Sequence, residues 1–251
     1  MPPPATRSFP AYHLPPGHRR YCLVTLALFA LIWLLLAVTP RDRADWALEN
    51  VLLVLFVPAL AASLRFFPLS RLSWSLILLF LGLHSVGAHY TYAEVPYDDW
   101  TEALLGFRLN EVLGLDRNHF DRLVHFSYGL LLAYPMRELF FRVADARGFW
   151  AYFLPLDLTL STSALFELIE WAAATAFGGD LGVAYLGSQG DPWDAQKDMA
   201  LAGLGALVTM SVTLWINWRW QRDFTREWTR SLRVKRMEPL GEVALARLGT
   251  E

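Results

Sequence analysis

The chain has 251 residues, of which 55% are hydrophobic and 18% are charged, and its mean hydropathy is +0.29. Its apolar residues lie in blocks long enough to cross a bilayer, not in the shorter alternations of a soluble core. The formal net charge of −2 excludes a nucleic-acid-binding role that depends on overall basicity. Its single cysteine, Cys22, excludes a disulfide framework or a zinc ribbon within this chain.

The chain opens with a proline-rich stretch, and we expect residues 1–20 to form a disordered cytoplasmic leader. Arg19 and Arg20 precede the first apolar block, as basic residues do in a secretory signal peptide. The end of that block, Leu-Ala-Val-Thr-Pro, offers no small-x-small cleavage site. We therefore interpret the block as a membrane span.

Six apolar segments approach or exceed the roughly 20 residues that a helix needs to cross the hydrocarbon core. Trp and Tyr residues stand near their ends, as is typical of the two membrane interfaces. The predicted fold class is therefore all-α, a polytopic membrane helix bundle of about six transmembrane helices within residues 21–218. The segments are 21–38, 46–67, 74–92, 120–140, 150–177 and 198–218.

Basic residues divide unevenly between the two sides of the membrane when six helices are threaded through it. The richer side carries the leader, arginines such as Arg65, Arg71 and Arg142, and the basic tail at 219–251. By the positive-inside rule this side is cytoplasmic, so both termini are predicted to lie in the cytoplasm. The tail is interpreted either as a topology anchor or as a binding site for anionic membrane lipids.

Two long loops remain on the outer side, at 94–118 and 178–197. The first combines acidic residues with apolar residues at helical spacing, which predicts one amphipathic helix on the outer surface. The second is rich in glycine and ends in Gly-Asp-Pro-Trp-Asp. That ending is typical of a helix start, with Asp191 as the N-cap and Pro192 at the first helical position.

Ionisable residues gather near the outer ends of four predicted helices. A rise of about 1.5 Å per residue places them in one slab roughly 10 to 15 Å deep. Charged groups at membrane depth are costly unless they face a wet or protein-lined interior, so they are candidates for function. They are His84 and His89 in the third helix, His119, Asp121 and His125 in the fourth, Glu167 and Glu170 in the fifth, and Asp194, Lys197 and Asp198 in the sixth.

Spacing limits which of these residues can act together. His84 and His89 are five residues apart, so they share a face only if the helix frays or kinks, for instance at Gly87. Three pairs do share a helix face, because their members are three or four residues apart. These pairs are Asp121 with His125, Glu167 with Glu170, and Asp194 with Asp198.

Imidazole and carboxylate groups together form a ligand set that suits divalent zinc, manganese or iron. A metal-bound water would then be the nucleophile or base that acts on a lipid-linked or envelope substrate. The predicted metal ligands are His84, His89, His119, Asp121, His125, Glu170 and Asp194. The predicted catalytic residues are Asp121, His125, Glu167, Glu170 and Asp198.

Two other interpretations of the same residues stay open. A transporter or proton-coupled permease would use them as a proton relay, although the inner halves of the helices hold few polar residues to continue a path. A structural network would instead pair Arg122 and Lys197 with Glu167, Glu170 or Asp198. Single residues also have simple structural interpretations: interface histidines for His84 and His119, and helix caps for Asp191 and Asp194.

Four motifs, at 84–92, 117–126, 166–171 and 187–199, resemble in this order the YjdF-type family of bacterial inner-membrane proteins. The resemblance runs from about residue 33 to residue 218. It implies a multi-pass protein of the bacterial inner membrane and supplies no reaction.

A weaker likeness is to the VanZ-like membrane proteins, which are connected with glycopeptide resistance. Their Asp-basic-x-x-His-Phe-x-x-Tyr element resembles the start of the fourth helix here, at Asp121 and His125. Their later acidic positions resemble Glu170 and Asp198. This chain departs from that pattern because it lacks a clear arginine between the two elements and adds His84, His89 and Glu167.

Overall fold

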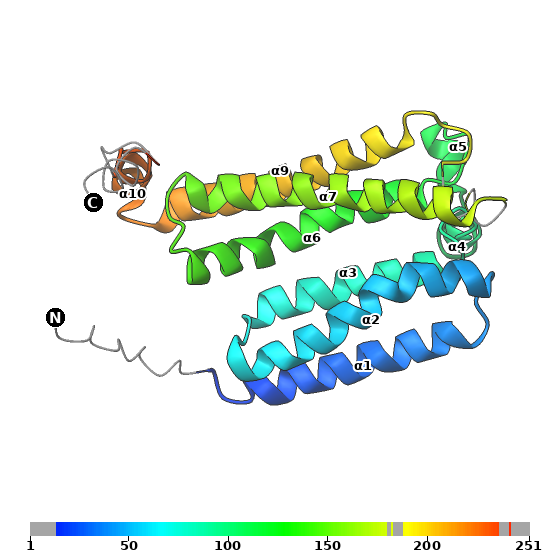
Figure 1. The fold of residues 1–251 in the computed structure, drawn as a ribbon, viewed down its shortest axis with the longest axis horizontal. Coiled ribbons are helices and arrows are strands. Elements are labelled where there is room, and N and C mark those ends of the chain that lie inside the picture. Colours follow the sequence, from blue (N-terminus) through cyan, green and yellow to red (C-terminus); the bar gives the residue numbers. More distant parts are fainter. Residues whose placement is uncertain (1–13, 180–181, 183–187, 236–240, 242–251) are drawn as a thin grey trace, which may run out of the picture.

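The computed structural model describes residues 14–179, 182, 188–235 and 241, and these residues form helices without any strand (Figure 1). Six of the helices are long and run side by side: α1 (His18–Val38), α2 (Arg43–Phe66), α3 (Arg71–His89), α6 (Phe120–Val143), α7 (Trp150–Phe177) and α9 (Asp194–Trp220). Three are short: α4 (Tyr97–Leu105), α5 (Leu109–Leu113) and α10 (Phe224–Ser231). The predicted all-α bundle is confirmed, and the long helices begin and end within a few residues of the predicted positions.

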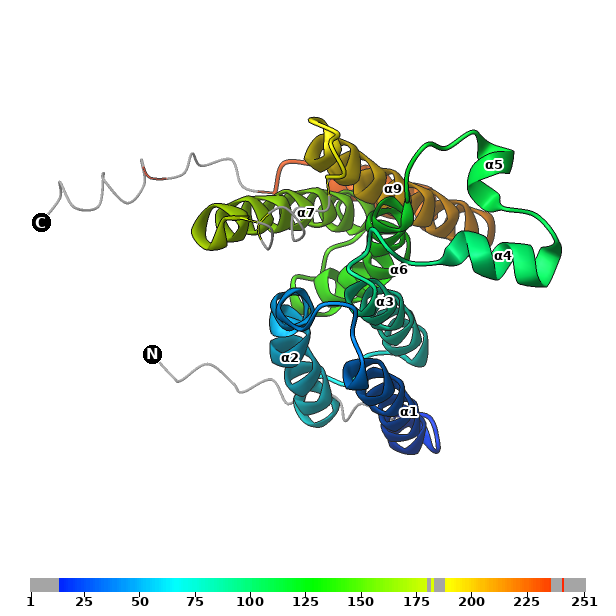
Figure 2. The same cartoon turned by 90° about the vertical axis from the view of Figure 1, so that its right-hand side faces the viewer.

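Five of the described helices, α1, α2, α3, α7 and α9, are long and apolar enough to cross a membrane. Helix α6 is also long, with 24 residues, but it is more polar because it carries charged residues near both ends, Asp121 and Arg142 among them. It lies at the centre of the bundle (Figure 2), where it packs against α3, α7 and α9. Protein therefore shields the polar groups of α6 from lipid, and its length and central position are consistent with the sixth predicted span.

The two ends of the bundle differ in charge. Helix α1 begins, and α9 ends, at the same end of the molecule, on the left of Figure 1. Arg71 at the start of α3, Arg142 near the end of α6 and Arg219 near the end of α9 lie at that end. The positive-inside rule predicts that this end faces the cytoplasm. Residues 1–13 of the predicted leader, residues 236–240 and 242–251 of the predicted tail, and residues 180–181 and 183–187 of the second outer loop lie outside the described residues.

The first outer loop forms two helices, α4 and α5, where one was predicted. Gly106 ends α4 in the left-handed conformation, with φ at 79°, and so interrupts the apolar pattern. Arg108 then pairs with Asp99 and Glu102 and folds the segment back on α4. Both helices project to one side of the bundle (Figure 2) and leave apolar side chains exposed, with Leu104 at 82%.

The start of α9 also differs from the prediction. The helix begins at Asp194 with Trp193 as its N-cap, so the assignment of Asp191 as N-cap and Pro192 as first helical residue was wrong. Asp191 instead closes a turn before the helix, because one of its carboxylate oxygens accepts a hydrogen bond from the Trp193 amide at 3.1 Å. Its other oxygen accepts hydrogen bonds from Arg122 and Lys197, each at 2.5 Å.

Helices α6 and α9 approach each other more closely than ordinary side chains allow. A Cβ atom added to Gly129 would overlap the carbonyl oxygen of Ala202, and one added to Gly205 would overlap that of Phe126. Small residues let two membrane helices make this backbone contact, which supplies van der Waals attraction where lipid provides no hydrophobic drive. The contact brings the outer halves of α6 and α9 together.

We predict that Gly205→Ala destabilises the fold by about 1–3 kcal/mol, because the new methyl group meets backbone atoms that cannot move aside. Unfolding of the purified protein by SDS or heat measures the effect. Gly82→Ala in α3 is the matched control, since its Cβ meets nothing within 4 Å. Alanine in a helix interior is more stable than glycine by roughly 0.5–1 kcal/mol, so the control is expected to unfold no more easily than the wild type. Equal behaviour of the two variants would contradict the packing argument.

Candidate functional site

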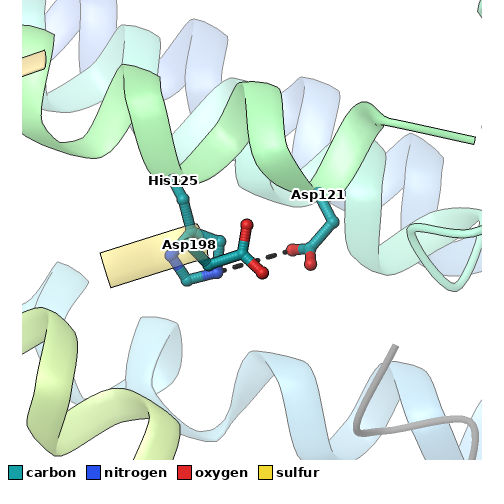
Figure 3. A group of neighbouring side chains, drawn as sticks. All are labelled: Asp121, His125 and Asp198. Carbon is teal, nitrogen blue, oxygen red and sulfur yellow. Dashed lines mark ion pairs between the residues drawn. The ribbon is translucent and has the colours of Figure 1, made fainter. Parts of the chain in front are cut away.

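Three ionisable side chains from α6 and α9 face one another near the outer end of the bundle (Figure 3). Asp121 and His125 are one turn apart on α6, and Asp198 faces them from α9. One ligand atom from each residue lies within 4.8 Å of the other two. His125 and Asp198 are buried, at 8% and 2% exposed. We call these three residues the acidic triad.

Glu167 on α7 adds a further carboxylate beside the triad. His125 Nε2 lies 3.5 Å from Asp121 Oδ1 and 3.6 Å from Glu167 Oε1. These distances are long for hydrogen bonds. They are close to the roughly 3.4 Å that separates two ligands bound about 2.1 Å from a tetrahedral metal ion.

Two oxygens of this site have no hydrogen-bond donor among the described residues. They are the buried Oε1 of Glu167 and the buried Oδ1 of Asp198. A buried carboxylate oxygen without a partner is destabilising, so such an atom calls for an explanation. A bound cation or a bound proton would supply the missing partner.

Glu170 and Glu49 extend the acidic site across the bundle. Glu170 lies one turn beyond Glu167 on α7, and it interacts electrostatically with Glu167 and Glu49. Glu49, on α2, is only 8% exposed and interacts in the same way with Asp121. Glu49 and its buried neighbour Asp45 were not among the site residues predicted from the sequence. The signal for Glu49 was its position inside a predicted span, at a depth similar to that of the other acids.

The other three histidines that were predicted as metal ligands, His84, His89 and His119, lie outside the triad. His84 bonds on one side to the carbonyl of Glu49, at 3.1 Å, and on the other to the hydroxyl of Tyr92, at 2.5 Å. It therefore supports the Glu49 edge of the acidic site. His89 bonds to the carbonyl oxygen of Leu36 at 2.7 Å, so it points toward α1 and away from His84.

His119 precedes α6, and its Nδ1 lies 3.2 Å from Arg122. Burial lowers the pKa of His119, and the positive charges of Arg122 and Arg117 lower it further. Its surroundings therefore disfavour protonation of the ring. It belongs to the layer of ion pairs above the acidic site.

That layer is formed by two arginines, one lysine and two aspartates. Asp194 is 6% exposed and accepts hydrogen bonds from both Arg117 and Arg122. Asp191 pairs with Arg122 and with Lys197. We call these five residues the outer ion-pair network. Hydrogen bonds from Lys197, from the Trp193 amide and from Arg122 hold the pKa of Asp191 well below its usual range, so its carboxylate stays charged in mildly acidic conditions.

The observed ion pairs of Arg122 and Lys197 differ from the structural network that the sequence left open. Arg122 and Lys197 pair with Asp191 instead of Glu167, Glu170 or Asp198. In the part of the chain that the structure describes, no arginine or lysine is ion-paired with the triad or with Glu167. These basic residues are thus ion-paired within the outer network, and the site beneath it contains more carboxyl groups than basic groups.

We predict a strong coupling between Arg117 and Asp194, measured by a double-mutant cycle of Arg117→Gln and Asp194→Asn in unfolding experiments. Counting side-chain atoms alone, Arg117 is 17% exposed and Asp194 is 8% exposed, so the coupling energy should reach about 1–3 kcal/mol. The exposed pair of Arg108 and Glu102 serves as the control and should give less than about 1 kcal/mol. A coupling no larger than that of the control pair would show that the outer network does not hold the helix ends together.

These features define a class of protein, an integral membrane helix bundle with a buried acidic site at one end. The chain belongs to the family described as "Predicted membrane protein (DUF2238)", which it matches over residues 21–219. It is 40% identical over 181 residues to "Inner membrane protein YjdF" of Escherichia coli (strain K12), a match that covers 72% of this chain and 82% of that protein. No solved structure matches the chain. The predicted family and the multi-pass inner-membrane location are therefore confirmed.

Proposed function

We propose that the protein is a membrane enzyme whose outer site holds a divalent metal ion between Asp121, His125 and Asp198. One observation carries this proposal: the three side chains offer ligand atoms within 4.8 Å of one another at the buried junction of α6 and α9. Catalytic zinc sites commonly use three protein ligands and leave a further position for water or substrate. A His and carboxylate set also suits manganese or iron.

The charge balance of the site supports a bound cation. Five carboxyl groups gather here, those of Glu49, Asp121, Glu167, Glu170 and Asp198. The nearby arginines, by contrast, are engaged with Asp191 and Asp194. Several buried carboxylates cannot all stay charged side by side without a counter-ion. A divalent ion would neutralise two of them and would satisfy the unpaired oxygen of Asp198.

The residues around the triad suggest separate roles in catalysis. A bound metal ion would activate a water molecule as nucleophile or base. Glu167, which lies beside His125 but outside the three-residue ligand group, is placed to accept a proton from that water. Glu170, next to Glu167, would tune its charge. His84 and Tyr92 would hold the Glu49 edge of the site in position.

The location of the site supports a substrate in the outer leaflet or the envelope. The triad lies at the end of the bundle that carries α4 and α5, whose exposed Leu104, Leu105 and Val112 would rest on the membrane surface. Amphipathic helices of this kind lie in the interface plane and contact lipid. A lipid-linked or other envelope molecule could therefore reach the site without crossing the membrane.

A permease based on the same groups is less well supported. A permeation path should continue with polar groups toward the cytoplasm, yet the described polar contacts below the site join neutral hydroxyls. Tyr128 and Thr162 bond to each other at 2.6 Å, and Thr159 bonds to the backbone of its own helix at 2.8 Å. These two contacts carry no charge, whereas the outer side of the site carries the ion pairs of Arg117 and Arg122 with Asp191 and Asp194.

We predict that the detergent-purified protein contains about one divalent transition-metal ion per chain, and that Asp198→Asn and His125→Gln each reduce metal affinity at least ten-fold. Removal of a ligand leaves too few donors for tight binding, because the triad supplies three. Elemental analysis after gel filtration, followed by titration with zinc, manganese and iron(II), measures the loss. The effect should appear without loss of folded protein.

His89→Gln is the matched control, since this histidine contacts the Leu36 carbonyl and lies apart from the triad. It should retain the wild-type metal content. A wild-type protein that binds none of the three metals would contradict the proposal. So would an Asp198→Asn variant with unchanged affinity.

A further inference from the structure

The cytoplasmic end of the bundle holds a cavity of about 300 Å³, separate from the acidic site. This volume lies at the small end of the range for ligand sites in proteins. The cavity is lined by the end of α6, the start of α7, the end of α9 and the helix α10. Its polar lining consists of Arg137, Arg147, Tyr152, Asn217, Gln221 and Glu227.

Helix α10 forms a fixed wall of this cavity. It crosses the end of the bundle and is seen nearly end-on in Figure 1. Its Trp228 packs against Tyr152 of α7, with ring centroids 6.0 Å apart. At its C-terminal end Ser231 accepts hydrogen bonds from the Phe149 amide and from the Trp150 ring, both at 3.0 Å. These contacts hold α10 in place, so the cavity is a defined feature of the fold.

Arg137 is the cation in the cavity that has a hydrogen-bond donor without an acceptor. Its guanidinium group lies over the ring of Tyr152, 5.1 Å from the centroid, and its buried Nε has no hydrogen-bond acceptor. No carboxylate of the described chain forms an ion pair with it, whereas Arg147 is paired with Asp145 at 2.7 Å. The stacking on Tyr152 orients Arg137 without neutralising its charge.

We propose that this cavity binds a phosphate group, with Arg137 as the principal cation. The planar guanidinium presents paired N–H donors that match phosphate oxygens. The cavity lies at the cytoplasmic interface, at the level where the headgroups of anionic phospholipids gather. Two sources offer this chemistry, the phosphate of such a lipid and free inorganic phosphate.

Substitutions of Glu227 and of Arg137 should change phosphate affinity in opposite directions. Its carboxylate lines the same cavity and accepts a hydrogen bond from Gln221 at 2.5 Å. A negative charge there opposes a bound anion. Replacing it with a neutral side chain should therefore strengthen phosphate binding, and replacing Arg137 should weaken it.

The experiment uses the full chain in phosphatidylcholine nanodiscs with increasing phosphatidylglycerol, and native mass spectrometry counts the retained lipid. A parallel titration uses inorganic phosphate alone. Arg137→Gln should weaken binding about ten-fold or more, the equivalent of one lost charged hydrogen bond. Glu227→Gln should tighten it. Arg65→Gln is the control, because Arg65 is an exposed arginine at the same end that lies over Phe66.

The possible results either identify the ligand or overturn the proposal. Retention of phosphatidylglycerol without binding of inorganic phosphate identifies a lipid site, and binding of inorganic phosphate identifies a soluble ligand. Equal binding by wild type, Arg137→Gln and Glu227→Gln overturns the proposal. An equal loss in Arg65→Gln also overturns it, because general surface charge would then account for binding. If Arg137→Gln fails to fold, Glu227→Gln alone decides, and the absence of tighter binding overturns the proposal.

Discussion

The backbone contact between α6 and α9 is the constraint on which the outer site depends. Gly129 and Gly205 leave no room for a side chain between the two helices. His125 lies one turn before Gly129, and Asp198 lies two turns before Gly205. The separation of imidazole and carboxylate is therefore determined by rigid backbone packing, which is how sites gain the precision that binding and catalysis require.

The outer end of the bundle separates its charges into two layers. Arg117 and Arg122 satisfy Asp191 and Asp194 near the surface. Beneath them the acidic groups have His125 as their nearest basic partner within the described chain. A uniform mixture of these charges would have formed a self-neutralised network. The separation instead leaves the buried layer dependent on protons or a cation from outside the chain.

The helix bundle and part of the candidate site could be predicted from the sequence alone. Membrane spans are predictable because each must be long and apolar by itself, and depth alone placed Asp121, His125, Glu167 and Asp198 in one slab. Rotation about the helix axis was not predictable, since it depends on packing against other helices. For that reason the contacts of His84 with Glu49 and of His89 with Leu36 became clear only in the structure. Glu49 was overlooked for another reason, since its depth in α2 was visible in the sequence and was not used.

The polar character of α6 has a consequence for the synthesis of the protein. This helix emerges from the ribosome before α7 and α9, two of the three long helices that shield it. During that interval only α3, among its main partners, is available to cover its charged ends. The lateral release of α6 into lipid is therefore unfavourable until the last third of the chain has been made. Retention of α6 by the insertion machinery until α7 and α9 have been made would avoid this exposure to lipid.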